Sequence, residues 1–211
     1  MSFLLQAREK QAMSIIKNLE KRNMKGYYCN TKQECAELIL SLLKDGDTVT
    51  WGGSESLKQC GLPEMLKQSG RFNVLDRAEY TPETMREFYE KAFSSNVFLM
   101  GTNAITLDGV LVNVDGEGNR VASLIFGPEK VFVIAGMNKV VSTVEESLDR
   151  VRNFASPPNT IRLNKNTPCA ATGKCGNCLC EDCICSQVVY TRRSRKKDRI
   201  QVILVGESLG F

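Results

Sequence analysis

The chain has 211 residues, of which 42% are hydrophobic and 25% are charged, so it holds enough apolar material for one sizeable core and is not disordered throughout. The formal net charge is only +4, and six of the 28 basic residues lie between positions 192 and 199, which excludes a uniformly basic nucleic-acid-binding surface. There is no histidine, so catalysis by a Ser–His or Cys–His pair is also excluded.

The first residues, MSFLLQAREKQ, have no basic lead and an apolar run of only three residues, and we therefore expect no signal peptide. No stretch approaches the length needed to span a bilayer, so we expect no membrane segment. Both features predict a soluble cytoplasmic protein. In that compartment, clustered thiols favour metal binding or redox chemistry over structural disulfides.

In the first half of the chain, apolar residues at helical spacing alternate with short runs typical of strands. Helices are predicted over 2–24, over 31–43 with Thr31 and Glu34 as a capping box, after GGSES as far as about Ser69, and over 82–93 with Thr81 as its cap. Strands are predicted at 27–29, 48–51, 72–75 and 96–100. The last of these, NVFLM, is uniformly apolar, as expected for a strand buried on both faces.

In the second half, the Gly/Asn/Asp-rich region 101–120 contains AIT and VLVNV, which predict a pair of short strands. Further strands are predicted at 131–135 and 200–205, and a capped helix from Thr143 to about Asn153, ended by Pro157-Pro158. The alternation predicts an α/β fold with a mostly parallel sheet covered on both faces. We expect one domain over 1–211, with a Cys-rich lobe and basic segment embedded at 167–199, before the last strand.

Three polar loops follow predicted strands: WGGSES at 51–56, the 101–120 region, and AGMNKV at 135–140. Ligands of doubly wound sheets bind at such strand ends, and bare glycines beside a serine hydroxyl suit a phosphate or carboxylate. The same Gly-Gly-Ser also suits an ordinary strand-to-helix turn, and Asp108-Gly109 an ordinary hairpin turn. The candidate ligand-binding residues are Gly52, Gly53, Ser54, Glu55, Asn103, Asp108, Asn113, Asp115, Gly118, Asn119, Arg120, Asn138 and Lys139.

The segment TPCAATGKCGNCLCEDCIC, residues 167–185, holds six of the nine cysteines and includes two C-x2-C units. These spacings favour a metal held by thiolates, either zinc or an iron–sulfur cluster, over disulfides. The neighbouring basic strip, 192–199, either compensates the charge of such a site or binds phosphate or RNA, and we rank nucleic acid last. The three remaining cysteines, Cys29, Cys35 and Cys60, are interpreted as small buried hydrophobic residues.

Blocks along nearly the whole chain resemble the LUD (lactate-utilisation) domain family: TVTWGGSESL, GTNAITLDGVLVNVDGEGNRVASLIFGP, VFVIAGMNKVV, CAATGKC and IQVILVGESLGF. The resemblance implies a three-layer fold of the NagB/RpiA/CoA-transferase type. It also implies a link to bacterial lactate oxidation, as a non-redox component beside iron–sulfur subunits. A recurring C-x5-C-x2-C-x6-C set in similar proteins selects Cys169, Cys175, Cys178 and Cys185 as metal ligands, with Cys180 and Cys183 as alternates.

Three functions stay open at this point. The leading hypothesis is a lactate-utilisation accessory protein that binds a small phosphate-bearing or carboxylate ligand and carries a thiolate metal site, with iron–sulfur lactate oxidation subunits as its partners. The alternatives are an acyl/CoA-transfer or isomerase-type enzyme, and a metal-dependent regulatory or assembly module. Glu55 lies in a suitable loop for acyl transfer, but no matching motif supports it. The sequence leaves open whether the protein forms a homo-oligomer.

Overall fold

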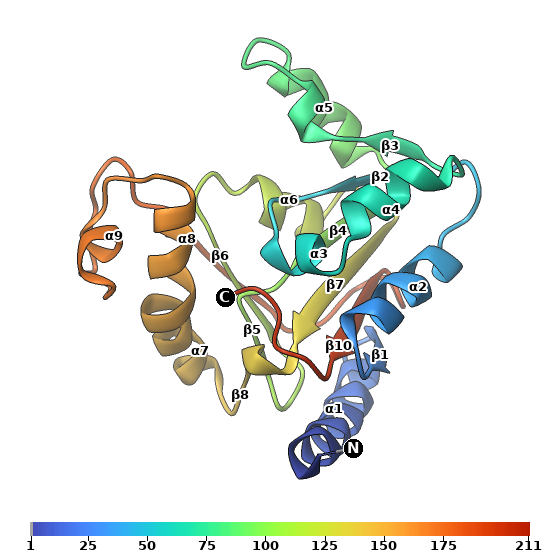
Figure 1. The fold of residues 1–211 in the computed structure, drawn as a ribbon, viewed down its shortest axis with the longest axis horizontal. Coiled ribbons are helices and arrows are strands. Elements are labelled where there is room, and N and C mark those ends of the chain that lie inside the picture. The colour runs from blue at the N-terminus through green and yellow to red at the C-terminus, as the bar shows by residue number, and fades with distance from the viewer. Residues whose placement is uncertain (1) are drawn as a thin grey trace.

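Six parallel strands form the main sheet of the computed structural model, which describes residues 2–211 (Figure 1). In their order across the sheet, these strands are β1 (Lys25–Cys29), β10 (Ile200–Val205), β7 (Lys130–Gly136), β4 (Val97–Gly101), β2 (Thr48–Trp51) and β3 (Asn73–Leu75). Every neighbouring pair is parallel, which confirms the mostly parallel α/β sheet. Because parallel strands end at one edge of the sheet, the loops after β2, β4, β7 and β10 lie together.

A second, smaller sheet begins directly after β4. Its strands, in spatial order, are β8 (Val140–Val141), β5 (Ala104–Thr106), β6 (Leu111–Asp115) and β9 (Gln187–Thr191). The β5–β6 hairpin is the predicted pair of short strands. The strand β9 was not predicted, because its half-exposed sequence QVVYT offers no buried apolar run. Its antiparallel pairing places Gln187 opposite Asp115, so the end of the cysteine segment lies beside the end of β6.

The helices are α1 (Phe3–Lys21), α2 (Lys32–Leu42), α3 (Glu55–Gln59), α4 (Leu62–Ser69), α5 (Met85–Phe93), α6 (Asn119–Ile125), α7 (Val144–Arg150), α8 (Ser156–Arg162) and α9 (Pro168–Thr172), with single turns η1 (Arg77–Glu79), η2 (Met137–Lys139) and η3 (Val151–Ala155). None of the helices described in residues 2–211 combines the length and apolar character needed to cross a bilayer.

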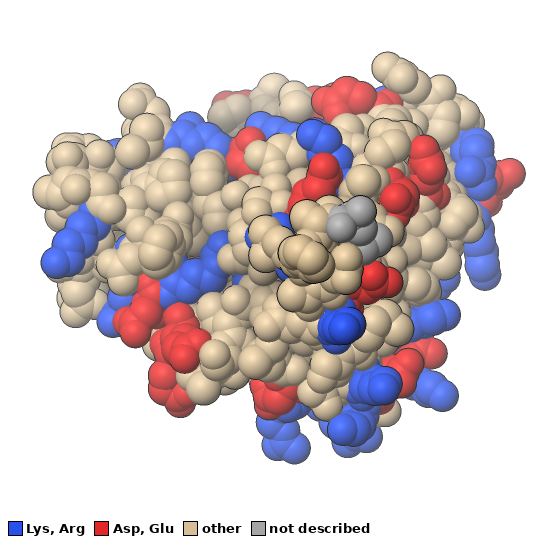
Figure 2. All heavy atoms as spheres, turned by 60° about the horizontal axis from the view of Figure 1, so that its bottom comes forward, with Lys and Arg blue, Asp and Glu red and all other residues tan. Residues whose placement is uncertain are grey.

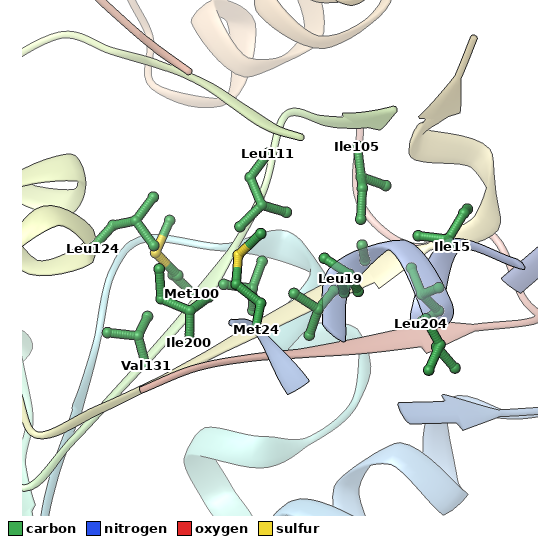
Figure 3. Close-up of a cluster of buried hydrophobic side chains, with 14 of the residues drawn as sticks. Ile15, Leu19, Met24, Met100, Ile105, Leu111, Leu124, Val131, Ile200 and Leu204 are labelled. Carbon is green, nitrogen blue, oxygen red and sulfur yellow. The ribbon is translucent and has the colours of Figure 1, made fainter. Parts of the chain in front are cut away.

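The main sheet is covered on both faces, as its apolar strands require. The helices α2, α3 and α4 cover one face with buried side chains such as Ile39 and Leu57. The helices α1 and α6 and the second sheet cover the other face, where Leu19, Met100 and Leu111 meet in one cluster (Figure 3). Each fully buried Leu, Ile or Met side chain contributes about 1.5–3 kcal/mol relative to exposure, so the two clusters hold the sheet between its layers.

The predicted helix caps form, with one shift in position. Thr31 and Thr143 are N-caps whose hydroxyls accept hydrogen bonds from Glu34 and Glu146 backbone N–H groups, at 3.2 and 3.3 Å. By contrast, α5 begins at Met85 rather than at Pro82. The Thr84 hydroxyl accepts a hydrogen bond from the Thr81 N–H at 3.0 Å, and this closes a separate turn before the helix begins.

The prediction that Pro157-Pro158 ends a helix is wrong. Both prolines lie in the first turn of α8, which continues from α7 through η3, a turn of π-helix. The Ser156 N–H there donates to the Val151 carbonyl, five residues back. A proline inside a continuous helix removes an N–H donor and crowds the carbonyl four residues back, and the π turn directly before these prolines replaces the regular hydrogen-bond pattern at that point.

The basic segment divides into a buried residue and an exposed strip. Arg199 is 9% exposed, and its guanidinium donates to the carbonyls of Pro128, Leu124 and Ser123 at 2.9, 2.7 and 2.9 Å. The exposed strip, residues 192–197, begins only after β9, so roughly 16 Å of strand separates it from Cys185. This exceeds the screening length of about 8 Å at physiological salt. The expected compensation of the cysteine charge by this strip is therefore not supported by its position.

Basic and acidic side chains are interspersed over the face shown in Figure 2, which agrees with the absence of a uniformly basic surface there. The largest group of basic side chains lies along one edge of this view.

We expect Arg199→Met to lower the free energy of unfolding by about 2–4 kcal/mol, because three buried carbonyl groups lose their donor. The measurement is chemical denaturation followed by circular dichroism. Arg195→Met, the same change at an exposed position, serves as the control and should stay within about 0.5 kcal/mol of the wild type. Equal losses in the two variants would contradict the role assigned to Arg199.

Candidate ligand-binding pocket

A cavity of about 330 Å³ opens at the edge of the main sheet where the parallel strands end. Its walls come from the loop after β2, the ends of β4 and β6, and η2 after β7. The rest of the lining comes from α8, from the end of the cysteine segment at Ile184, and from Gly210 and Phe211. The cavity therefore lies between the main sheet and the Cys-rich lobe. Its volume is at the lower end of the range for small-molecule sites.

The three predicted loops converge on this cavity. The predicted residues that line it are Gly53, Ser54, Glu55, Asn103, Asp115, Asn119, Arg120 and Lys139. Gly52, Asn113 and Gly118 support the lining from behind. A side chain at Gly52 would press on Arg120, and the Gly118 N–H donates to the Asp115 carboxylate at 3.2 Å. Residues that are adjacent in the sequence thus have different roles: some face the cavity, and others support the residues that do.

Asp108 and Asn138 do not line the cavity. Asp108 lies at the turn of the β5–β6 hairpin, where its carboxylate pairs with Arg22 at 2.5 Å. Asn138 holds the end of the chain in place: its amide oxygen accepts a hydrogen bond from the Leu209 N–H at 3.0 Å. A Cβ at Gly136 would lie 2.5 Å from that same nitrogen, so only glycine lets the chain cross β7 here. This crossing brings Gly210 and Phe211 to the cavity.

Arg120 joins the two sheets from beneath the cavity. One guanidinium nitrogen donates to the Gly101 carbonyl at 3.0 Å and to the Asn113 amide oxygen at 2.6 Å. The other donates to the Asn103 amide oxygen at 3.0 Å and to the Val114 carbonyl at 2.9 Å. Burial lowers the pKa of Arg120, and the Asp115 carboxylate acts against this. The Arg120 side chain is thus committed to the fold, although its charge contributes to the field in the cavity.

Lys139 is the least compensated charge in the pocket. It is 5% exposed, and its ammonium nitrogen lies 3.0 Å from the Ser56 hydroxyl. Within residues 2–211, no carboxylate lies within ion-pair distance of this nitrogen. Burial, followed by the positive charges of Arg150 and Arg120, lowers the pKa of Lys139 to about 7. The amine is therefore partly neutral near neutral pH.

The sequence did not point to several residues of the lining. Ser56 follows two predicted residues but is buried inside the cavity wall, and Arg162 and Lys165 come from the unpredicted helix α8 and the turn after it. Arg162 forms an ion pair with Glu55 at 3.4 Å. Arg77, another lining residue, stacks its guanidinium over the Tyr89 ring at 5.7 Å. Only a signal for long-range contact, absent from a single sequence, would have grouped these residues.

The nine cysteines fall into two groups. Cys29, Cys35 and Cys60 are buried in the core, as predicted, and burial raises the pKa of Cys29 to about 11, which makes it a poor nucleophile. The six thiols of the lobe are more accessible, except for Cys169. Cys185 lies next to the pocket wall, with its sulfur 3.2 Å from the Ser156 hydroxyl. The lobe is thus part of the architecture of the cavity.

The arrangement of the lobe does not enclose a metal ion. Within residues 2–211 no three Cys, Asp or Glu side chains converge as a ligand group. The Cys178 and Cys180 sulfurs lie 3.4 Å apart, and the hydrogen bond between them lowers the pKa of Cys178. Cys169 instead lies against the Thr167 and Thr160 hydroxyls, at 3.2 and 3.5 Å. The donor type suits a soft cation, but the side chains as placed do not fit one.

We expect Lys139→Met to raise the melting temperature at pH 7 by roughly 4–8 °C, which corresponds to about 2 kcal/mol for a chain of this size. Between pH 7 and pH 10.5 the unfolded chain binds a proton at this lysine that the folded chain does not bind. Wild-type stability therefore rises with pH over this range, and the difference in melting temperature between Lys139→Met and wild type becomes smaller.

The measurement is thermal unfolding of both proteins at several pH values. Lys197→Met, at an exposed position, is the control, and its difference in melting temperature from wild type should not change with pH. A constant gap between Lys139→Met and wild type from pH 7 to pH 10 would contradict the lowered pKa.

Comparisons with known proteins agree with this architecture. The fold is similar to the crystal structure of a DUF162 family protein from Deinococcus radiodurans, with a TM-score of 0.56 and 13% identity, over 94% of this chain and 98% of that one. A translation initiation factor eIF-2B structure from Pyrococcus horikoshii OT3 is matched more weakly, with a TM-score of 0.37 and 19% identity over 53% and 48% of the two chains. A search of curated proteins found no match. The model of the LUD domain family matches residues 12–205, and the chain therefore belongs to the LUD domain family.

Proposed function

We propose that this protein is a cytoplasmic, lactate-utilisation-type accessory protein that binds a small carboxylate or phosphate-bearing ligand in the cavity at the strand ends. The convergence of the three polar loops on one cavity is the observation that supports this function. Five basic side chains line the cavity, namely Arg77, Arg120, Lys139, Arg162 and Lys165, against three acidic ones, Glu55, Asp115 and Glu117. A concave site with excess positive charge favours an anion.

The serine hydroxyls add directional contacts. Ser54 and Ser56 both line the cavity, and a Cβ at Gly101 would lie 2.9 Å from the Ser54 hydroxyl oxygen. Glycine at this position leaves the space beside the hydroxyl free for a ligand. The family resemblance implies a fold whose relatives bind phosphate or CoA groups at such strand-end loops, which makes phosphate and carboxylate compounds the first ligands to test.

We expect pyruvate, lactate, inorganic phosphate or acetyl-CoA to raise the melting temperature, and Gly53→Asp to abolish the effect. A Cβ at Gly53 would meet no atom within 4 Å, so the new carboxylate adds negative charge without a clash. Saturation at about 100 times Kd corresponds to about 2.7 kcal/mol of stabilisation. Gly53→Asn, of equal size and no charge, is the matched control and should retain much of the response. Potassium chloride at equal ionic strength serves as the blank.

Stabilisation no greater than that of the blank for every compound would contradict the proposed function. An equal response in Gly53→Asp and Gly53→Asn would show that binding lies elsewhere.

A second candidate function is acyl/CoA transfer, favoured by the position of Glu55. One carboxylate oxygen of this residue is buried without a hydrogen bond, and it lies 3.3 Å from Lys58 and 3.4 Å from Arg162. A carboxylate facing a ligand cavity is a suitable acyl acceptor. The acetyl-CoA arm separates the two functions. The enzyme is favoured if CoA esters alone stabilise the protein, and if the protein catalyses an acyl transfer that Glu55→Gln abolishes.

We also propose that the cysteine lobe binds zinc or an iron–sulfur cluster after its side chains rearrange, and that iron–sulfur lactate oxidation subunits dock on it. Burial raises the pKa of Cys185, and the nearby thiols of Cys183, Cys175 and Cys169 raise it further, so three of the four favoured ligands and one alternate share one region. A metal-bound lobe that only recruits such subunits would be an assembly module.

Protein purified without oxygen should contain stoichiometric zinc, or iron with a brown colour, by elemental analysis. The double variant Cys175→Ser/Cys178→Ser should lose the metal and any copurifying iron–sulfur subunits. The matched double variant Cys180→Ser/Cys183→Ser should keep them, because these thiols lie outside the favoured set. A metal content that is equally low in wild type and both variants would refute the metal proposal.

A further inference from the structure

The amine of Lys139 can act as a nucleophile, which anion binding alone does not require. We propose that Lys139 forms an imine with a small carbonyl compound that also carries a carboxylate or phosphate group. This inference rests on the proposed anion-binding function of the same cavity and names its substrate class more narrowly.

The position of the amine supports this role. Lys139 lies on η2, directly after the central strand β7, and its side chain lines the cavity while remaining 95% buried, given its exposure of 5%. A Cβ at Gly210 would lie 3.3 Å from the Lys139 nitrogen and 2.8 Å from the Ser56 hydroxyl. The backbone at Gly210 thus packs against this pair, and the space for a ligand is the cavity that Lys139 lines.

The surrounding charges keep the amine reactive. The charged groups that act on Lys139 are the guanidinium groups of Arg150 on α7 and Arg120 on α6. Both guanidiniums are held by the fold: Arg150 donates to the Asn138 and Asn103 carbonyls at 3.1 and 2.5 Å, so it cannot turn away. Like charges and desolvation are the means by which proteins activate amine nucleophiles. An ordinary lysine is neutral in only about one molecule in 10³ at pH 7, which gives Lys139 a large advantage in free amine.

Ser56 positions the amine through the 3.0 Å hydrogen bond. Its hydroxyl fixes the direction of the amine nitrogen within the cavity and stabilises the ammonium form by accepting a hydrogen bond from it. Ser56 is therefore a positioning residue rather than a bond-forming one.

The reaction balances without an oxidant. The lone pair of the Lys139 nitrogen forms a bond to the carbonyl carbon, while the C=O π electrons move to oxygen. A proton then passes from nitrogen to that oxygen and gives a carbinolamine. A second proton, taken from solvent, converts the hydroxyl into water, which leaves as the nitrogen lone pair forms the C=N double bond of an iminium ion. The iminium ion then returns its remaining N–H proton to solvent. The products are one imine and one water molecule.

The excess of basic side chains around the cavity selects the rest of the substrate. Arg77, Arg162 and Lys165 line the same cavity, so a carbonyl compound with an anionic group matches both features. The volume of about 330 Å³ lies at the lower end of the range for small-molecule sites, so a compact carbonyl compound fits it.

The test is trapping with sodium cyanoborohydride, which reduces an imine to a stable secondary amine. The full chain is incubated near pH 7 with pyruvate, with dihydroxyacetone phosphate, with lactate, which lacks the carbonyl, or with acetone, which lacks the anion. Intact-mass measurement counts the adducts, and peptide mapping locates them. We expect one adduct, on Lys139, formed with pyruvate or dihydroxyacetone phosphate only. It should form at least tenfold faster than an adduct on Lys165, which is the other lysine among the lining residues.

The two carbonyl arms distinguish a carboxylate from a phosphate substrate. Lys139→Arg, which keeps the positive charge, should lose the adduct. Ser56→Ala should keep it, with the rate–pH profile moved to lower pH, because the ammonium form loses its acceptor. An unchanged profile would overturn the positioning role of Ser56. Labelling spread evenly over the lysines would overturn the imine proposal. Thermal stabilisation by pyruvate without any adduct at Lys139 would also overturn it, while leaving the proposed anion binding intact.

Discussion

The guanidinium of Arg120 holds together the two sheets on which the pocket depends. Strand β4 of the main sheet ends at Gly101, and the chain passes through Asn103 into β5 of the second sheet. Arg120 bonds to the Gly101 carbonyl on one side and to Asn113 and Val114 on the other. Since a buried charged donor without its acceptors costs several kcal/mol, the strand ends, the turn at Asp115 and the start of α6 are tied to one another.

This arrangement explains why the cavity is both polar and positively charged. Arg120 and Arg150 donate hydrogen bonds to backbone and amide groups, and these neutral groups do not cancel the positive charges of the two guanidiniums. Burial and these two charges lower the pKa of Lys139, which has no carboxylate within ion-pair distance among residues 2–211. Such a group opposes folding, and sites that keep one at the expense of stability are often functional. The buried positive charge around Lys139 therefore underlies the stability cost, the anion preference and the amine chemistry of this pocket.

The cysteine lobe and the loop site share a boundary. Ser156 lines the cavity and also contacts the Cys185 sulfur, and a Cβ at Gly116 would meet the Ile184 backbone at 3.4 Å. These contacts place the Cys185 thiol directly beside a wall of the pocket. The two features that look separate in the sequence are therefore neighbours in space, because β9 returns the chain to the end of β6.

The sequence by itself determined the parallel α/β architecture, the buried strands and the three strand-end loops, since hydrophobic period and capping are local properties. It also placed Lys139 and Ser54 at strand ends. Only the tertiary structure decided that Asp108 and Asn138 serve the fold, that Arg199 is buried, and that Arg162 pairs with Glu55 at the cavity. These outcomes depend on contacts between segments far apart in the chain, and they are set by burial and electrostatics that no local pattern encodes.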